Sequence, residues 1–133
     1  EHAVQALEYA CETVPSLILA ADGGGGALYH GGYRCVGNSS FLASHGVRRV
    51  VNTALNLGAF FVRYPQSVTA AEQEGVVFLH LGWIDSEEQG LEEQVLAEAC
   101  RFVHEARRVG DSVLVHCAQG KSRSATVASP LTL

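Results

Sequence analysis

The sequence predicts one α/β domain with a central, largely parallel sheet of about four to five strands flanked by helices. Short apolar runs alternate along the chain with amphipathic segments at helical spacing, which is typical of a layered α/β fold. The chain has 133 residues, enough for one domain with its own core. Its hydrophobic content of 47% and charged content of 17% are those of a globular protein. We therefore interpret 1–133 as a single domain.

Short segments are predicted to form the strands. Each is an apolar run, often rich in β-branched residues, with turn-forming or charged residues at its ends. These segments are 17–20, 33–36, 47–53, 76–81 and 113–115. Gly31 and Gly32 are expected to form a turn before the second segment. Ligands collect beyond the carboxyl ends of strands in parallel sheets, so residues that follow these segments are the first candidates for a site.

Helices are predicted between the strands. The segments are 2–14, 40–45, 70–74 and 91–109, and a further helix is expected to open near Ser122. The segment 91–109 has the clearest apolar face, with glutamates at its start, arginines at its end and Gly110 after it. Asn38 or Ser39 is suited to cap the helix over 40–45.

Composition excludes several classes of protein. The formal net charge of −5 and the absence of a Lys/Arg run argue against a nucleic-acid partner. The longest apolar runs are too short to span a bilayer, and no signal-peptide pattern is present. The four cysteines have no Cys-x-x-Cys spacing, which removes the support for a zinc or thioredoxin-like site. We expect no metal site and no membrane span.

Two nucleotide-binding motifs are excluded by their spacing. The glycines of 23–26 do not satisfy Gly-x-Gly-x-x-Gly, so we interpret 22–26 as a turn or flexible connector. The triplet 120–122, Gly-Lys-Ser, is similar to the end of a nucleotide P-loop. That motif requires a glycine where Val115 stands, so a nucleotide is not expected there.

The stretch 113–124 carries the strongest chemical signal. An apolar strand runs into His116 and Cys117, then a loop containing Gly120, and then the start of a helix. The N–H groups at a helix start can form an anion-binding nest, in which the pKa of the Cys117 thiol would fall below its ordinary value. The planar guanidinium of Arg123 can bind two phosphate oxygens. A cysteine at a strand end is often only a buried apolar residue, but Gly120 and Arg123 at this spacing favour catalysis.

The run 116–126, His-Cys-Ala-Gln-Gly-Lys-Ser-Arg-Ser-Ala-Thr, resembles the cysteine-dependent protein tyrosine phosphatases, in particular their dual-specificity branch. Segments 36–38 and 51–54 are also similar to that branch, so the resemblance covers about 33–126, and 1–32 match poorly. It implies a phosphatase-like α/β fold and hydrolysis through a phosphocysteine, without a cofactor. A nucleophilic thiol needs a reducing compartment, so we expect a cytoplasmic protein.

The resemblance also implies roles around the phosphate. Cys117 would be the nucleophile, and Arg123 would bind the oxygens of the transition state. Ser124 would donate a hydrogen bond to the sulfur of Cys117 and ease its departure. His116 would orient the loop, whose other residues would bind the phosphate largely through their N–H groups. Those residues are Ala118, Gln119, Gly120, Lys121 and Ser122.

A general acid is required because the leaving oxygen must be protonated as it departs. Asp85, in the acidic loop that follows the segment 76–81, stands where the family places this residue. The same carboxylate would then activate the water that hydrolyses the phosphocysteine. Glu87 and Glu88, in the same loop, remain open as alternatives.

The function favoured by these features is hydrolysis of phosphotyrosine and phosphoserine/threonine in proteins, with phosphorylated kinases among the candidate substrates. A second hypothesis keeps the chemistry and takes a phosphoinositide, a glycan phosphate or an RNA 5′-phosphate. A third is a phosphate-binding module with little turnover. A rhodanese-like domain is disfavoured by the position of Asp85 and its acidic loop.

The C-terminal sequence departs from the family pattern. The family normally extends the helix that follows Ser124 and adds further helices. Here Pro130 interrupts the pattern and the sequence ends at Leu133. We therefore expect a C-terminally truncated domain with exposed apolar surface, and dimerisation remains open.

Overall fold

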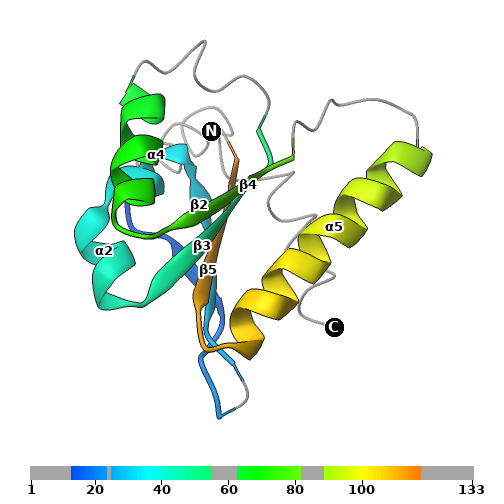
Figure 1. The fold of residues 1–133 in the computed structure, drawn as a ribbon, viewed down its shortest axis with the longest axis horizontal. Helices are drawn as coiled ribbons and strands as arrows, with labels where there is room; N and C mark the ends of the chain where they lie inside the picture. Colours follow the sequence, from blue (N-terminus) through cyan, green and yellow to red (C-terminus); the bar gives the residue numbers. More distant parts are fainter. Residues whose placement is uncertain (1–12, 24, 55–62, 82–88, 118–133) are drawn as a thin grey trace, which may run out of the picture.

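The computed structural model describes residues 13–23, 25–54, 63–81 and 89–117. These residues form a sheet with helices on both of its faces (Figure 1). The strands are β1 (Ser16–Leu19), β2 (Leu28–Gly32), β3 (Val47–Asn52), β4 (Val77–His80) and β5 (Ser112–Cys117). The helices are the 3-10 helix η1 (Tyr33–Gly37) and the α-helices α2 (Ser39–Ser44), α4 (Arg63–Gln73) and α5 (Gln89–Arg108).

The sheet has five strands in the order β1-β2-β5-β3-β4. β2, β5, β3 and β4 run parallel, and β1 is an antiparallel edge strand. The central strand β5 is the most apolar: Val113, Leu114 and Val115 are fully buried. Burial on both faces is expected for the centre of a parallel sheet. The predicted fold class is therefore confirmed.

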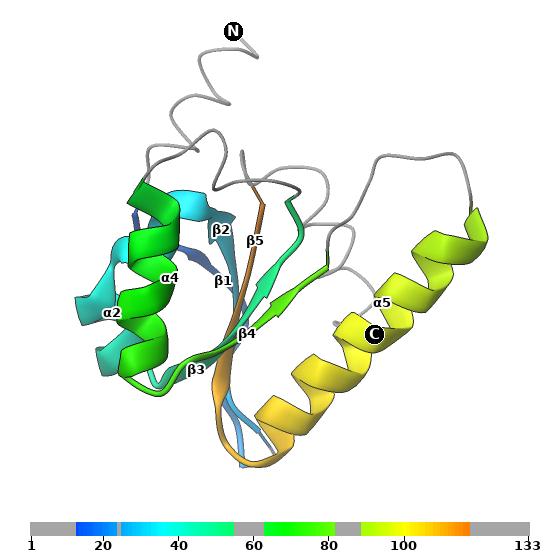
Figure 2. The same cartoon turned by 45° about the horizontal axis from the view of Figure 1, so that its top comes forward.

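Each face of the sheet packs against its own helices (Figures 1 and 2). α2, α4 and η1 cover one face, and α5 covers the other. Because side chains alternate along a strand, Leu114 lies in the cluster under α2 and α4, while Val113 and Val115 lie in the cluster under α5. Ala99 and Val103 of α5 are buried in the second cluster, as the predicted apolar face of that helix requires.

The prediction for the second strand is wrong. The strand is Leu28–Gly32, and 33–36 form most of η1 instead. Gly31 is not a turn residue: it pairs with His116, and a Cβ built on it would lie 2.7 Å from Sγ of Cys35. Its glycine is therefore explained by close packing within the sheet rather than by a chain reversal.

The helix predicted over 70–74 is longer than expected. It begins at Arg63 and ends at Gln73, with Pro65 in its first turn, where a proline costs no intrahelical hydrogen bond. Its apolar face is narrow: only Tyr64 and Ala71 are buried, so the sequence gives a weak periodic signal. The segment 56–62 of the predicted connector lies outside the described residues.

Other predictions are confirmed with small shifts. Asn38 caps α2, because its side chain accepts a hydrogen bond from the N–H of Phe41 at 3.1 Å. Gly46 follows with a φ of 65°, as expected after a helix. β5 continues to Cys117, two residues beyond its predicted end, because both residues pair with β2. The helix predicted over 2–14 and the one expected near Ser122 fall outside the described residues, apart from 13–14.

Candidate active site

The carboxyl ends of four parallel strands meet at one edge of the sheet, which lies toward the top in Figure 2. The pairing aligns this edge: Gly32 is opposite Cys117, and His116 is opposite both Gly31 and Asn52. Cys117 is therefore the last residue of the central strand, and the residue before it, His116, is paired with β2 on one side and with β3 on the other. This is the edge at which an α/β sheet binds its ligands.

The described residues include two of the predicted site residues. Cys117 is described as the last residue of β5, and His116 as a fully buried residue before it. The predicted acid Asp85, with the alternatives Glu87 and Glu88, lies outside the described residues. So does the predicted phosphate loop, namely Ala118, Gln119, Gly120, Lys121, Ser122, Arg123 and Ser124.

His116 is fixed through both its main chain and its side chain. Its carbonyl oxygen accepts hydrogen bonds from the N–H of Thr53 at 2.9 Å and from the Thr53 hydroxyl at 3.0 Å. Its Nε2 lies 2.9 Å from the hydroxyl of Tyr64, which reaches it from the first turn of α4. The residue before the predicted nucleophile is thus attached to β3 and to α4, as its predicted role in orienting the loop requires.

Tyr64 is suited to hold a buried imidazole. Its side chain is 6% exposed, and burial raises the pKa of its hydroxyl far above the ordinary tyrosine value. The hydroxyl therefore stays protonated near neutral pH. A tyrosine hydroxyl can donate to an imidazole nitrogen or accept from it, so the contact holds the ring in either neutral tautomer.

Replacing Tyr64 with phenylalanine is expected to lower the free energy of unfolding by about 1–2 kcal/mol, because it leaves Nε2 of a buried histidine without its partner. The measurement is urea denaturation of the two proteins. Tyr29→Phe is the matched control: Tyr29 is buried in the same core cluster, and its hydroxyl makes no hydrogen bond among the residues that the structure describes. Equal losses for the two variants would contradict a specific Tyr64–His116 bond.

A second pair of polar side chains lies at the same edge, one strand further on. Asn52 ends β3 and is 5% exposed, and its Nδ2 lies 3.0 Å from Nδ1 of His80, the last residue of β4. Asn52 pairs in register with both His116 and His80. A row of polar residues, His116, Asn52 and His80, therefore crosses the sheet from β5 through β3 to β4, beside the predicted nucleophile.

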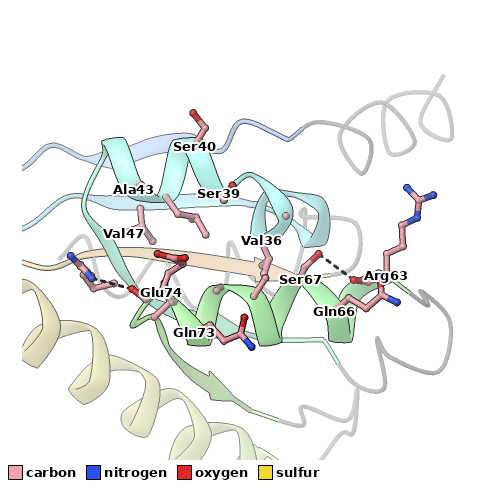
Figure 3. A pocket seen from close by; sticks show the side chains of 16 residues that line it. Val36, Ser39, Ser40, Ala43, Val47, Arg63, Gln66, Ser67, Gln73 and Glu74 are labelled. Atoms are coloured by element: carbon pink, nitrogen blue, oxygen red, sulfur yellow. Dashed lines mark hydrogen bonds between the residues drawn. The ribbon is translucent and has the colours of Figure 1, made fainter.

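A pocket of about 760 Å³ lies on the helical face that includes Tyr64, between α2 and α4 (Figure 3). Val36, Leu42 and Val47 contribute apolar surface, and polar side chains of α4 line its rim. Two hydrogen bonds join residues that line the pocket. The hydroxyl of Ser67 donates to the carbonyl of Arg63, and the guanidinium of Arg48 donates to the carbonyl of Glu74. Cys117, the one predicted catalytic residue within the described ranges, is not among the residues that line the pocket.

The described parts of the chain hold no group of three or more His, Cys, Asp or Glu side chains arranged to bind a metal ion. In the same parts, no helix has the length and hydropathy needed to cross a bilayer. Cys35 is a free, buried thiol and Cys100 a free, half-buried one.

Comparison with known proteins identifies the family. The model of the dual specificity phosphatase catalytic domain matches residues 28–129, from the first residue of β2 to beyond the predicted phosphate loop. The chain belongs to the dual specificity phosphatase family. The resemblance inferred from the run 116–126 is thereby confirmed.

Individual relatives agree with this assignment. The chain is 33% identical over 119 residues to dual specificity protein phosphatase 1 of Arabidopsis thaliana, covering 90% of this chain and 51% of the relative. It is 44% identical over 54 residues to human dual specificity protein phosphatase 22, covering 41% of this chain and 29% of the relative. The chain thus spans about half, or less, of these relatives.

A solved structure shows the same fold. The crystal structure of human DUSP28 superposes with a TM-score of 0.63 and 27% sequence identity, covering 89% of this chain and 69% of that one. The chain therefore carries a dual specificity phosphatase catalytic domain with the family's sheet.

Sequence reasoning missed the residues that hold this edge together. Tyr64 and His80 belong to no motif, and both of them and Thr53 reach their partners across long sequence separations. Asn52 and Thr53 lie in the segment 51–54, whose similarity to the family does not indicate their hydrogen bonds. The available signal was their place at strand ends, because polar residues that directly follow apolar strands collect at one edge of a parallel sheet.

Proposed function

We propose that this domain is a protein phosphatase that hydrolyses phosphotyrosine and phosphoserine/threonine esters through a phosphocysteine intermediate. The observation that carries the proposal is the position of Cys117 at the carboxyl end of the central parallel strand, directly after a histidine fixed by Tyr64 and Thr53. Family membership supports the same chemistry.

In the proposed first step, the Cys117 thiolate attacks phosphorus, a P–S bond forms and the bond to the ester oxygen breaks. Asp85 donates a proton to the departing oxygen, so that it leaves as an alcohol or phenol. Arg123 and the loop N–H groups bind the three equatorial oxygens, over which charge spreads in the transition state.

In the second step, water attacks the phosphocysteine, Asp85 accepts a proton from that water, and the thiolate leaves as inorganic phosphate forms. Ser124 donates a hydrogen bond to the departing sulfur. Oxidation of the thiolate would stop both steps, so we place the reaction in a reducing compartment such as the cytoplasm.

Replacing Asp85 with asparagine is expected to lower kcat for a phosphotyrosine peptide about 10²-fold, because the amide cannot protonate the leaving oxygen. The measurement is release of inorganic phosphate, without added metal, from phosphotyrosine and phosphothreonine peptides. Glu87→Gln is the matched control from the same acidic segment and is expected to retain nearly full activity. A larger loss for Glu87→Gln would move the general acid to that residue.

The same assay tests the substrate class. Turnover of both peptides supports a dual-specificity protein phosphatase. A wild-type protein that ignores both peptides but cleaves a phosphoinositide, a glycan phosphate or an RNA 5′-phosphate would overturn the protein-substrate proposal. A protein that binds orthovanadate without turning over any of these esters would be a phosphate-binding module.

A further inference from the structure

Asn52 occupies the junction between the strand of the nucleophile and the strand that leads to the predicted general acid. It ends β3, which lies between β5 and β4 in the sheet. Its main chain is opposite His116 on one side and His80 on the other. The sequence reaches Asp85 shortly after His80. Among the β3 residues that pair with both β5 and β4, Asn52 is the one at the carboxyl ends of these strands.

The orientation of the Asn52 amide is determined by its neighbours. Its Oδ1 accepts a hydrogen bond from the N–H of Ala54 at 2.9 Å, so the other end of the amide, Nδ2, is the atom that faces His80. Nδ2 can only donate, and it lies 3.0 Å from Nδ1 of His80. Nδ1 therefore accepts in this contact, which places the ring proton of His80 on Nε2.

A main-chain hydrogen bond also holds the end of β4, and a ring contact within β4 orients the His80 side chain. The N–H of Leu81 donates to the main-chain oxygen of Asn52 at 3.0 Å. The imidazole of His80 stacks on the ring of Phe78, with ring centroids 5.5 Å apart and planes 8° from parallel. Asn52 thus binds the end of β4 through both its main chain and its side chain, although His80 itself is exposed.

We propose that Asn52 and His80 are a positioning pair for the acid-base step: they fix the end of β4, and through it the chain that carries Asp85, relative to the nucleophile strand. The proposal rests on the proposed function, in which Asp85 is the general acid. Small displacements of a catalytic group are costly, so the pair should matter most when the leaving oxygen depends on protonation.

The test compares two leaving groups in His80→Leu and His80→Asn. Phenyl phosphate needs protonation of its leaving oxygen, whereas p-nitrophenyl phosphate releases a stabilised anion. His80→Leu is expected to lower kcat about tenfold on phenyl phosphate and less than about twofold on p-nitrophenyl phosphate. His80→Asn places an amide oxygen near the position of Nδ1 and is expected to retain most of the activity. Equal losses on both substrates, or no loss on either, would overturn the proposal.

His104→Leu is the matched histidine control. His104 is exposed on α5, on the opposite face of the sheet, and makes no hydrogen bond within the described part of the chain. In the Asp85→Asn background, His80→Leu should cause no further loss on phenyl phosphate, because the group that it positions is already inactive. A full additional tenfold loss in that background would mean that His80 acts independently of Asp85, contrary to the proposal.

The tautomer of His80 gives a readout that needs no variant. Nitrogen-15 NMR of the wild-type protein should show an unprotonated Nδ1 and a protonated Nε2 for His80, and the reverse assignment would overturn the pairing. Failure of the proposed function is distinguishable: if Cys117→Ser hydrolyses both substrates as the wild type does, the phosphocysteine mechanism is wrong. If Cys117→Ser is inactive but the His80 variants hydrolyse both substrates as the wild type does, the phosphocysteine mechanism stands and the proposal of a positioning pair is wrong.

Discussion

Replacing Cys117 with serine is expected to lower the rate of p-nitrophenyl phosphate hydrolysis by at least about 10⁴-fold. Cys117 is the proposed nucleophile, and the groups that bind phosphate and protonate the leaving oxygen contribute little to the rate without it. A thiol at the start of an anion-binding loop can ionise near neutral pH, whereas a serine hydroxyl without an adjacent base cannot. Both proposed steps depend on this sulfur, first as the attacking group and then as the leaving group. The measurement is steady-state hydrolysis, with protein integrity checked by urea denaturation.

Cys100→Ser is the matched control for this change. Cys100 lies on α5, and burial raises the pKa of its thiol, which makes it a poorer nucleophile at neutral pH. Its replacement is expected to leave hydrolysis nearly unchanged, and iodoacetamide should modify Cys117 well before Cys100. Strong hydrolysis by Cys117→Ser, or faster alkylation of Cys100, would contradict the assignment of the nucleophile.

A candidate nucleophile could be proposed from sequence because the signal for it is local. Cys117, Gly120 and Arg123 lie within seven consecutive residues, and a fixed spacing over so short a stretch points to groups that converge on one anion. The parallel sheet was predictable for a similar reason, since Val113, Leu114 and Val115 form a continuous apolar run that only a central strand buries on both faces.

The contacts that hold the edge of the sheet around Cys117 could not be predicted in the same way. The Tyr64–His116 and Asn52–His80 contacts join residues 52 and 28 positions apart. Their geometry depends on strand order and on where α4 crosses the sheet, and neither is encoded in a local pattern. The error at 33–36 has the same origin, because Gly31 is a glycine on account of Cys35 and Pro15, which pack against it in three dimensions.

The segment 22–26, which contains four successive glycines, is interpreted from sequence as a turn or flexible connector, but one of its glycines is required by close packing. The predicted turn is present, with Asp22 and Gly25 exchanging hydrogen bonds of 3.0 and 3.2 Å. Gly26, however, serves close packing: its N–H donates to the carbonyl of Arg107 at 3.1 Å, and its own carbonyl accepts from Nε of Arg107 at 2.7 Å. A Cβ on Gly26 would collide with the carbonyl of Asp111.

Replacing Gly26 with alanine is therefore expected to lower the free energy of unfolding by about 3 kcal/mol, because a methyl group forced into packed backbone displaces the chain around it. The collision would separate the entry to β2 from the start of β5, where the N–H of Val113 donates to the carbonyl of Ala27 at 2.9 Å. The measurement is urea denaturation, with the loss read from the shift of the midpoint at an unchanged slope.

Gly23→Ala is the matched control within the same run. A Cβ on Gly23 meets no atom within 4 Å, and Gly23 is not among the glycines of positive φ. Alanine there is expected to change stability by less than about 1 kcal/mol, and in the stabilising direction if it mainly restricts the unfolded chain. If both variants are equally mild, the run is a flexible connector after all. If only Gly26→Ala strongly lowers the free energy of unfolding, the packing of β2 against α5 and β5 depends on the glycine at position 26.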